Sequence, residues 1–198
     1  DKPGVYFFYN ASGAIIYVGK ATSLRGRVWS YFRGMRTLRP IEQFVSEIVS
    51  IDWQETDSAL EAMIAEANAI KKFQPKYNVD GKDDKSWNYI VVTNDEYPRV
   101  ETIRQHTIQS TNYKLPTTNY TFGPYPGMNT KATMKLLRRL FQISTCEPGQ
   151  KRPCLYYELG QCLGVCTGKV TAAEYKRQVI RPLCLFLSGK TATVIKYF

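Results

Sequence analysis

Residues 4–9, GVYFFY, and residues 15–18, IIYV, are two runs of β-branched and aromatic residues separated by the turn-forming stretch Asn10–Gly13. Such residues favour extended strands, and a short connection with Asn and Gly favours an antiparallel pair. The stretch therefore predicts a β-hairpin at the start of the fold. Because paired strands present side chains on shared faces, we expect Tyr6 and Tyr17 to lie together on one face.

The segments after this hairpin alternate between helix and strand signals. A helix is expected from a cap at about residue 22 to Phe32, followed by a strand near Ile48–Gln54. The sequence Ser58-Ala59-Leu60-Glu61 is a capping box that opens a second helix, and Pro75 ends it. These signals predict a small mixed sheet with flanking helices, which we take as a first domain over residues 1–80.

The chain beyond about residue 80 has a different composition and predicts a second, smaller α+β domain over residues 81–198. A polar linker is expected at about 80–87. The further elements expected are a hairpin formed by Tyr89–Val92 and Arg99–Arg104 and a loop at 107–121. A basic amphipathic helix is expected at Lys131–Ile143, with Met134, Leu137, Leu140 and Phe141 turned inward. A final helix is expected from Thr171 and is kinked or interrupted at Pro182. The fold class of the whole chain is therefore expected to be α+β.

Charge and composition restrict the chemistry. The net charge is +10, and the excess lies beyond Arg99, where 14 Lys and Arg accompany four Glu. A polyanion, nucleic acid ahead of an anionic membrane, is the expected partner, with a charge that serves only solubility as the alternative. His106 is the only histidine, which excludes histidine-based triads and multi-histidine zinc sites. No apolar run approaches the roughly 18–20 residues that a bilayer crossing needs.

Two tripeptides in the hairpin carry a family resemblance. Gly4-Val5-Tyr6 is followed ten residues later by Tyr17-Val18-Gly19, and Lys20 and Arg27 follow at set distances. This arrangement resembles the signature of the GIY-YIG nucleases. Residues 65–72, AEANAIKK, resemble the metal-binding helix of that family.

Further segments narrow the resemblance. Residues 75–78, PKYN, resemble the closing asparagine motif of the GIY-YIG family. Within that family the chain is most similar to UvrC, the incision nucleases of bacterial nucleotide excision repair. The UvrC resemblance extends over nearly the whole chain through three more segments: KDDKS at 82–86, FGPYP at 122–126 and RPCLYY at 152–157.

The resemblance implies a metal-dependent phosphodiester hydrolase. Glu66 would hold Mg²⁺ or Mn²⁺ together with waters and phosphate oxygens, a ligand set that suits hard cations. Tyr6 or Tyr17 would take a proton from the attacking water. A phenol has a pKa near 10 and needs a nearby cation to lower it, and Lys20, three residues after Tyr17, is the candidate. Arg27 would bind the scissile phosphate through its planar guanidinium.

Other residues are expected to support this site. Asn78 would fix either the phosphate or the tyrosine geometry, and Tyr31, on the helix of Arg27, is a candidate for DNA binding. Further DNA contacts are expected from Lys71, Lys72, Lys76, Arg138, Arg139, Lys151 and Arg152. The first three lysines alternatively complement the dipole of the helix that they end. Taken singly, a tyrosine in a hairpin or an arginine on a helix is usually structural, so the joint spacing carries the hypothesis.

Four of the five cysteines are clustered in the spacing C-x7-C-x7-C-x3-C: Cys146, Cys154, Cys162 and Cys166. Cys184 falls in an apolar run and is expected in the core. The UvrC resemblance implies a cytoplasmic protein, in which disulfides are disfavoured and clustered thiols indicate a metal centre. The spacing does not choose the metal. The resemblance implies a [4Fe–4S] cluster, with zinc or free thiols as alternatives.

The expected function is incision of damaged double-stranded DNA on the 3′ side of a lesion within the UvrABC system. The resemblance implies UvrB as a protein partner, contacted through regions beyond this chain. Three alternatives stay open: a stand-alone UvrC-like nuclease that makes only the 3′ cut, a homing or restriction endonuclease with a sequence preference, and a DNA-binding module with an inactive nuclease fold.

Overall fold

The computed structural model of the chain describes four ranges: residues 1–33, 40–79, 87–104 and 118–197. The chain divides into two compact units. The first consists of Asp1–Lys85 with Gly123–Pro126, and the second consists of Ser86–Phe122 with Gly127–Phe198. Each combines a three-stranded sheet with helices, which confirms the α+β class. The expected linker lies, except for Trp87, outside the described residues.

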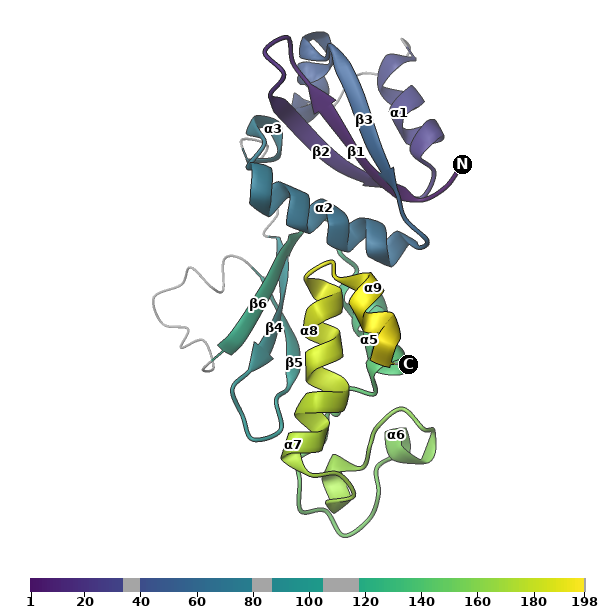
Figure 1. Cartoon of the computed structure of the whole chain (residues 1–198), viewed down its shortest axis with the longest axis vertical. Coiled ribbons are helices and arrows are strands. Elements are labelled where there is room, and N and C mark those ends of the chain that lie inside the picture. Colours follow the sequence, from purple (N-terminus) through teal and green to yellow (C-terminus); the bar gives the residue numbers. More distant parts are fainter. Residues whose placement is uncertain (34–39, 80–86, 105–117, 198) are drawn as a thin grey trace. The chain divides into compact units, whose positions relative to one another are not determined.

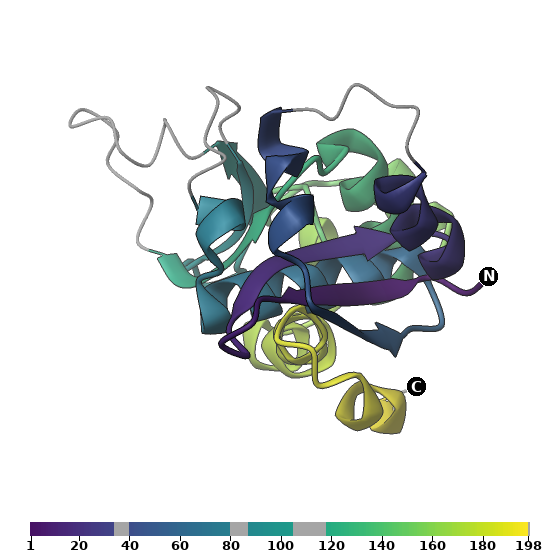
Figure 2. The same cartoon turned by 90° about the horizontal axis from the view of Figure 1, so that it is seen from above.

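The first unit contains the predicted hairpin, helices and third strand (Figure 1). Its elements are β1 (Gly4–Tyr9), β2 (Ile15–Ala21), α1 (Leu24–Phe32), the 3₁₀ helix η1 (Pro40–Glu47), β3 (Ser50–Glu55), α2 (Ala59–Phe73) and α3 (Lys76–Val79). The strand order is β2-β1-β3, and both pairs are antiparallel. Figure 2 shows β1 and β2, in purple, side by side.

The pairing of β1 with β2 places the two signature tyrosines on one face. Phe8 pairs with Tyr17 and Tyr6 pairs with Gly19, while the register shifts between Phe8 and Tyr9, which leaves Ile16 as the extra residue of a β-bulge. Directly paired residues point to the same side of a sheet. Tyr6 and Tyr17 therefore share a face, as the sequence predicts, with ring centroids 6.2 Å apart.

Side chains that alternate along the strands form two apolar clusters. One joins the sheet to α1 and η1, and its buried members are Tyr6, Phe8, Ile16, Leu24, Tyr31 and Phe44. The other joins the sheet to α2, and its buried members are Val5, Val18, Ala69 and Ile70. The sheet is thus covered by α2 on the face opposite α1, and each helix carries part of the candidate site.

The glycines of the two tripeptides have a packing reason. A Cβ atom at Gly19 would overlap the hydroxyl of Tyr6 and the ring of Tyr17, and a Cβ atom at Gly4 would overlap the carbonyl of Gln54 on β3. Any larger residue would push the Tyr6 ring or the neighbouring strand away. The glycines therefore let the tyrosines and the third strand approach closely.

The second unit has the sheet order β5-β4-β6 and a helical C-terminal part. Its elements are β4 (Asn88–Thr93), β5 (Val100–Arg104), β6 (Thr118–Tyr125), α5 (Thr130–Phe141), α6 (Leu155–Glu158), the 3₁₀ helix η2 (Val165–Thr167), α7 (Ala172–Tyr175), the π-helix η3 (Lys176–Ile180), α8 (Arg181–Leu187), α9 (Thr191–Val194) and the 3₁₀ helix η4 (Ile195–Tyr197). The predicted second hairpin is confirmed as β4 and β5. Among the described residues, none of the helices has the length and hydropathy that a bilayer crossing requires.

The structure corrects two expectations in this unit. A loop is expected at 107–121, but β6 begins at Thr118, and the part before it lies outside the described residues. Tyr120 and Phe122 supply strand propensity that the surrounding Thr and Asn residues conceal. In α5, Leu140 is expected to point inward but is 45% exposed, because Leu137 and Phe141 fill the buried face.

The interruption predicted at Pro182 takes the form of a π-helix. Proline has no N–H, so the regular helical bond to the carbonyl of Gln178 cannot form. The helix widens before it, and the N–H of Arg181 donates to the carbonyl of Lys176, five residues back. α8 then continues from Arg181.

Candidate active site

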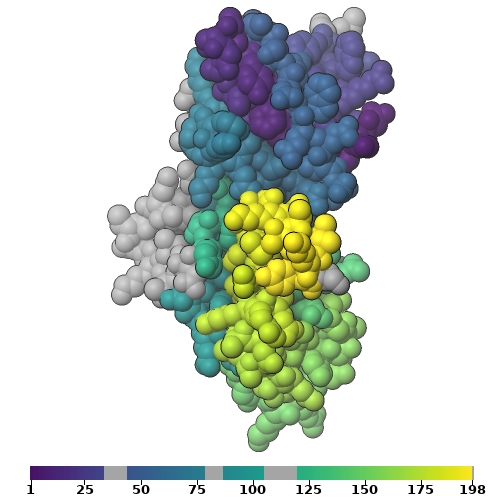
Figure 3. Space-filling model, in the orientation of Figure 1, coloured from purple at the N-terminus to yellow at the C-terminus, as the bar shows by residue number. Residues whose placement is uncertain are grey.

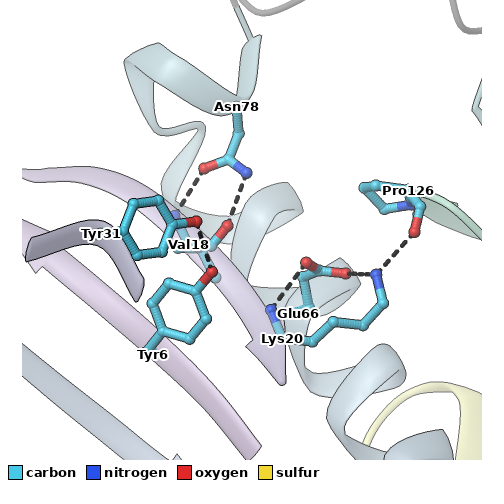
Figure 4. Close-up of polar contacts among 7 residues, drawn as sticks. All are labelled: Tyr6, Val18, Lys20, Tyr31, Glu66, Asn78 and Pro126. Atoms are coloured by element: carbon cyan, nitrogen blue, oxygen red, sulfur yellow. Dashed lines mark hydrogen bonds and ion pairs between the residues drawn. The ribbon is translucent and has the colours of Figure 1, made fainter. Parts of the chain in front are cut away.

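Two tyrosines and an arginine form the centre of the first unit's polar cluster. The hydroxyls of Tyr6 and Tyr31 are 2.9 Å apart, and Nη2 of Arg27 donates to the Tyr31 hydroxyl at 2.7 Å (Figure 4 draws the tyrosine pair). Arg27 and Tyr31 are neighbours on α1 because they are four residues apart, and the guanidinium lies 4.5 Å from the Tyr31 ring centroid. The sequence-predicted Tyr6, Arg27 and Tyr31 are therefore brought together.

Burial controls the ionisation of these phenols. It raises the pKa of Tyr6, Tyr17 and Tyr31 well above the ordinary value, and the charge of Arg27 acts in the opposite direction on all three. The tyrosines are therefore neutral hydroxyls at neutral pH. The cation that faces them is Arg27.

Glu66 is a buried carboxylate on α2, with 5% of its surface exposed. Oε1 accepts a hydrogen bond from the backbone N–H of Lys20 at 3.0 Å, and Oε2 accepts from Nζ of Lys20 at 2.6 Å. Burial raises the pKa of Glu66 above its ordinary value, although the ion pair with Lys20 acts in the opposite direction. The negative charge of Glu66 also contributes to raising the pKa of Tyr17, so the carboxylate and the phenol belong to one site.

The Lys20 side chain binds two groups of the first unit, and its suggested role beside Tyr17 stays a prediction. Its ammonium binds Glu66 and donates to the carbonyl of Pro126 at 2.7 Å, as Figure 4 shows. Pro126 belongs to Gly123–Pro126, a segment that packs with the first unit although it includes the last three residues of β6. Lys20 thus joins β2, α2 and this segment.

Asn78 fixes the strand beside Tyr17. Its Oδ1 accepts from the N–H of Val18 at 2.7 Å, and its Nδ2 donates to the carbonyl of Val18 at 2.8 Å (Figure 4). The Asn78 amide hydrogen-bonds to both the N–H and the carbonyl of Val18, as the backbone of a neighbouring strand would. Both polar atoms of Asn78 are therefore engaged with the backbone that carries Tyr17.

The basic residues predicted to contact DNA fall into two groups. Exposed side chains that offer their charge to solvent are Lys71, Arg139, Lys151 and Arg152. Side chains that lie over an aromatic ring are Lys72 over Phe73, Lys76 over Tyr77 and Arg138 over Tyr156. The Nε of Arg138 is buried without a hydrogen-bond partner among the described residues, which indicates packing between α5 and α6.

Three of the clustered cysteines meet in the second unit. The sulfur atoms of Cys146, Cys154 and Cys162 all lie within 4.8 Å of one another, and Cys146 and Cys154 are 3.5 Å apart. Cys166 is fully buried and is not a member of that group, although its thiol is among the hydrogen-bond partners of Cys154. Burial raises the pKa of Cys146 to about 11.

The pKa of the Cys154 thiol is lowered from its ordinary value. Burial acts to raise its pKa, but hydrogen bonds from the backbone N–H of Tyr157 and from the thiols of Cys146 and Cys166 outweigh burial and lower it. A thiolate is the form that binds a soft metal. The donor set of this cluster therefore fits a thiolate-bound metal.

Two family models match the chain, one in each half of the sequence. Residues 2–79 match the UvrC-like GIY-YIG domain, and residues 87–183 match the UvrC/Cho excinuclease middle domain. The chain belongs to the UvrC family. The resemblance carried by the two tripeptides and by the cysteine segment is thereby confirmed.

Similar UvrC proteins extend well beyond the matched region. The UvrABC system protein C of Moorella thermoacetica is 42% identical over 202 residues, which cover 99% of this chain and 31% of that protein. The same protein of Photorhabdus laumondii is 43% identical over 203 residues, which cover 98% of this chain and 32% of that protein. The chain spans about a third of the length of these relatives.

A solved structure is also similar to part of this UvrC-family chain. It is the GIY-YIG N-terminal endonuclease domain of UvrC from Thermotoga maritima bound to magnesium, with 39% sequence identity and a TM-score of 0.35. The match covers 39% of this chain and 84% of that domain.

The UvrC signature residues have supports that the sequence analysis did not find. Phe44 stacks on the ring of Tyr17, with centroids 4.7 Å apart, and on Tyr77 at 5.0 Å. The Tyr77 hydroxyl in turn donates to Glu47. No sequence motif marked Phe44 as part of the site, because a single aromatic residue after a basic stretch looks like any core residue. Pro126 lies in the FGPYP segment, which carried part of the family resemblance but gave no sign of a contact with Lys20.

Proposed function

We propose that the first unit hydrolyses a phosphodiester bond of damaged double-stranded DNA on the 3′ side of a lesion, as part of a UvrABC system in the cytoplasm with UvrB as partner. The observation that carries this proposal is the buried Glu66 carboxylate on the site that also holds Lys20 and the tyrosine–arginine cluster. Carboxylate, phenol and guanidinium can together hold a metal, accept a proton and stabilise phosphoryl charge, which are the tasks of phosphodiester hydrolysis. Residues 1–80 would form the nuclease domain and 81–198 the second domain.

Glu66 is the residue that would hold Mg²⁺ or Mn²⁺. One carboxylate, completed by waters and phosphate oxygens, fits the preference of these ions for hard oxygen ligands. When bound, such an ion acidifies a coordinated water and stabilises charge on the phosphoryl group. Lys20 forms an ion pair with Glu66 and would place its positive charge beside the bound phosphate. Arg27 would bind the phosphate oxygens through its guanidinium, and Asn78 holds the strand of Tyr17 in position.

We assign the general base to Tyr17. Burial keeps its hydroxyl protonated, so accepting a proton requires positive charge nearby when the substrate is bound. Arg27 supplies such a charge within the cluster, since it acts against the effect of burial on the pKa of each phenol. Tyr6 and Tyr31, which share a hydrogen bond, would orient the attacking water or the phosphate.

The test is the Glu66→Gln chain, in which an amide of the same shape replaces the carboxylate. A lesion-containing duplex labelled on the damaged strand is incubated with the chain, UvrA, UvrB and Mg²⁺ or Mn²⁺. We expect the rate of 3′ incision to fall at least about 1,000-fold, because removing an essential charge-stabilising group has effects of this size. Glu61→Gln, on the first turn of the same helix, is the matched control and should cut at the parent rate.

Two outcomes would sink the proposal. The first is that Glu66→Gln cuts as fast as the parent chain, and the second is that the parent chain binds the duplex and never cuts it. The second result would favour a DNA-binding module with an inactive nuclease fold. Cutting of undamaged DNA at a preferred sequence would instead favour a homing or restriction endonuclease, and cutting without UvrA and UvrB would favour a stand-alone 3′ nuclease.

We also propose a metal centre in the second unit. Cys146, Cys154 and Cys162 would supply three thiolates, and Cys166 would supply the fourth. Their proximity and the lowered pKa of Cys154 support this assignment. A [4Fe–4S] cluster is the form that the family implies, and zinc is the alternative that the same donor set would take.

A further inference from the structure

A cavity of about 720 Å³ opens on the second unit between β6 and the helical segment of residues 173–188. The residues that line it include Tyr120 and Phe122 of β6 and, from the helical segment, Lys176, Arg177, Arg181 and Cys184. The surface of the helical segment faces the viewer in Figure 3, in yellow-green. We call this cavity the β6–α8 groove.

One helical face builds the wall of the groove. The lining residues from Ala173 to Ser188 recur at intervals of three and four, which is the spacing of a single face. The π-helix lies in the middle of this face and carries Lys176 and Arg177. π-Helical turns are rare and frequently occur at functional sites. Cys184, expected in the core, is only half-buried and lines the groove instead.

The groove is positively charged on one side. Lys176, Arg177 and Arg181 are exposed, and no Asp or Glu is among the lining residues. Within the described ranges, none of the three forms a salt bridge. The nearby Glu174 uses its carboxylate to cap α7 through Thr171, and its charge also interacts with that of Arg177. Three adjacent cations with a single carboxylate near them favour an anionic ligand with several charges.

The other side of the groove carries aromatic rings. Tyr120 and Phe122 alternate along β6 and therefore lie on one face, with ring centroids 6.3 Å apart and an angle of 26° between the rings. Tyr120 is 53% exposed, so its second face is open. An exposed Tyr120 ring, backed by the half-buried Phe122 ring and lying beside a row of cations, is an arrangement that binds unpaired bases by stacking and their phosphates by charge.

We propose that the β6–α8 groove binds single-stranded nucleic acid. The phosphates lie along Lys176, Arg177 and Arg181, and one base stacks on Tyr120. A duplex fits this chemistry less well, because its bases are already stacked on one another. The inference rests on the proposed function only in taking nucleic acid as the ligand class. It assigns this contact to residues of the second unit that the sequence analysis did not single out.

The experiment measures binding of a labelled (dT)12 by fluorescence anisotropy, with Glu66→Gln as the parent so that nothing is cut. In the variant Lys176→Gln/Arg177→Gln/Arg181→Gln we expect at least about a 10-fold loss of affinity. The slope of log affinity against log salt should fall by about 2, since each lost phosphate contact contributes about 0.7. Tyr120→Ala should weaken binding by about 5-fold or more, whereas Tyr120→Phe should bind like the parent.

The matched control removes three charges elsewhere. Lys131→Gln/Lys135→Gln/Lys190→Gln changes exposed lysines of the second unit and should keep the affinity within about 2-fold. Equal loss in the two triple variants would overturn the proposal, because net charge alone would then explain binding. Equal competition by polyglutamate, or no effect of Tyr120→Ala, would also overturn it. Because the cleavage-inactive parent is used, failure here is distinct from failure of the incision proposal.

Discussion

The ion pair between Lys20 and Glu66 lies where β2 meets α2, and it carries the charge balance of the candidate active site. The Glu66 side chain is nearly buried, whereas 30% of the Lys20 side chain is exposed. A buried carboxylate that loses its partner keeps its desolvation cost without compensation. Removing Lys20 should therefore cost more stability than neutralising both residues together.

We predict that Lys20→Met lowers the free energy of unfolding by about 2 kcal/mol. This is below the usual cost of breaking a buried pair, because water partly screens Lys20. The double variant Lys20→Met/Glu66→Gln should recover at least half of that loss, since no unpaired charge remains. Urea unfolding of the single and double variants measures the coupling. Additive effects would show that the two side chains do not interact.

At this residue scale, the resemblance to the GIY-YIG signature predicted which residues belong to the site but not which pairs form. Tyr6, Arg27 and Glu66 were proposed from the motifs that carry this resemblance. The partner of Lys20 could not be found in that way, because the Glu66 carboxylate and the Pro126 carbonyl lie 46 and 106 residues further along the chain. Long-range contacts of this kind depend on the packing of whole elements.

The helix that begins at Thr171 shows how one element fixes another. Tyr175 on α7 is fully buried, and its hydroxyl accepts a hydrogen bond from the N–H of Ser144 at 3.0 Å. Burial raises the pKa of Tyr175 to about 12. The unfolded chain loses this proton near pH 10, while the folded chain keeps it until about pH 12. The free energy that the protonated Tyr175 contributes to folding is thus fully present below pH 10, and it is lost as the pH rises through 12.

We predict that Tyr175→Phe makes unfolding less dependent on pH in this window. The parent should lose about 2 kcal/mol more than the variant between pH 10 and 12, a figure set by a shift of two pKa units at full burial. At pH 7 the variant should be less stable by about 1 kcal/mol, because the N–H of Ser144 loses its acceptor. Urea unfolding at pH 7, 10, 11 and 12 tests both effects. Parallel pH profiles for the two chains would contradict the role of Tyr175.

Element boundaries were predictable where local chemistry decides them. Thr171 and Glu174 form the complete capping box that their spacing predicts. Ser58 accepts from the N–H of Glu61, but the Glu61 carboxylate accepts from Asp57 rather than from Ser58, so the second box is only half formed. β6 could not be predicted, because its pairing partner β4 lies far back in the sequence and its own residues carry weak signals.

At the scale of the whole molecule, the balanced charge up to Arg99 and the basic excess beyond it correspond broadly to the two family models. The second unit concentrates three features in one stretch of the chain: the cysteine cluster, the β6–α8 groove and exposed cations. A metal centre would order the cysteine segment, where α6 and η2 are only four and three residues long. Such short elements gain little stability from their own hydrogen bonds.

We predict that the chain purified without air contains about four irons and matching sulfide, with a broad visible absorption band. Cys154→Ala should lose the iron and the band, because it removes the cysteine whose pKa is lowered. Cys184→Ala is the matched control and should keep both, since Cys184 lies in the groove outside the cluster. Metal and sulfide analysis with a visible spectrum makes the measurement. One zinc per chain without a visible band would replace the cluster with a single ion, and metal-free anaerobic protein would reject the centre while leaving the Glu66 assignment intact.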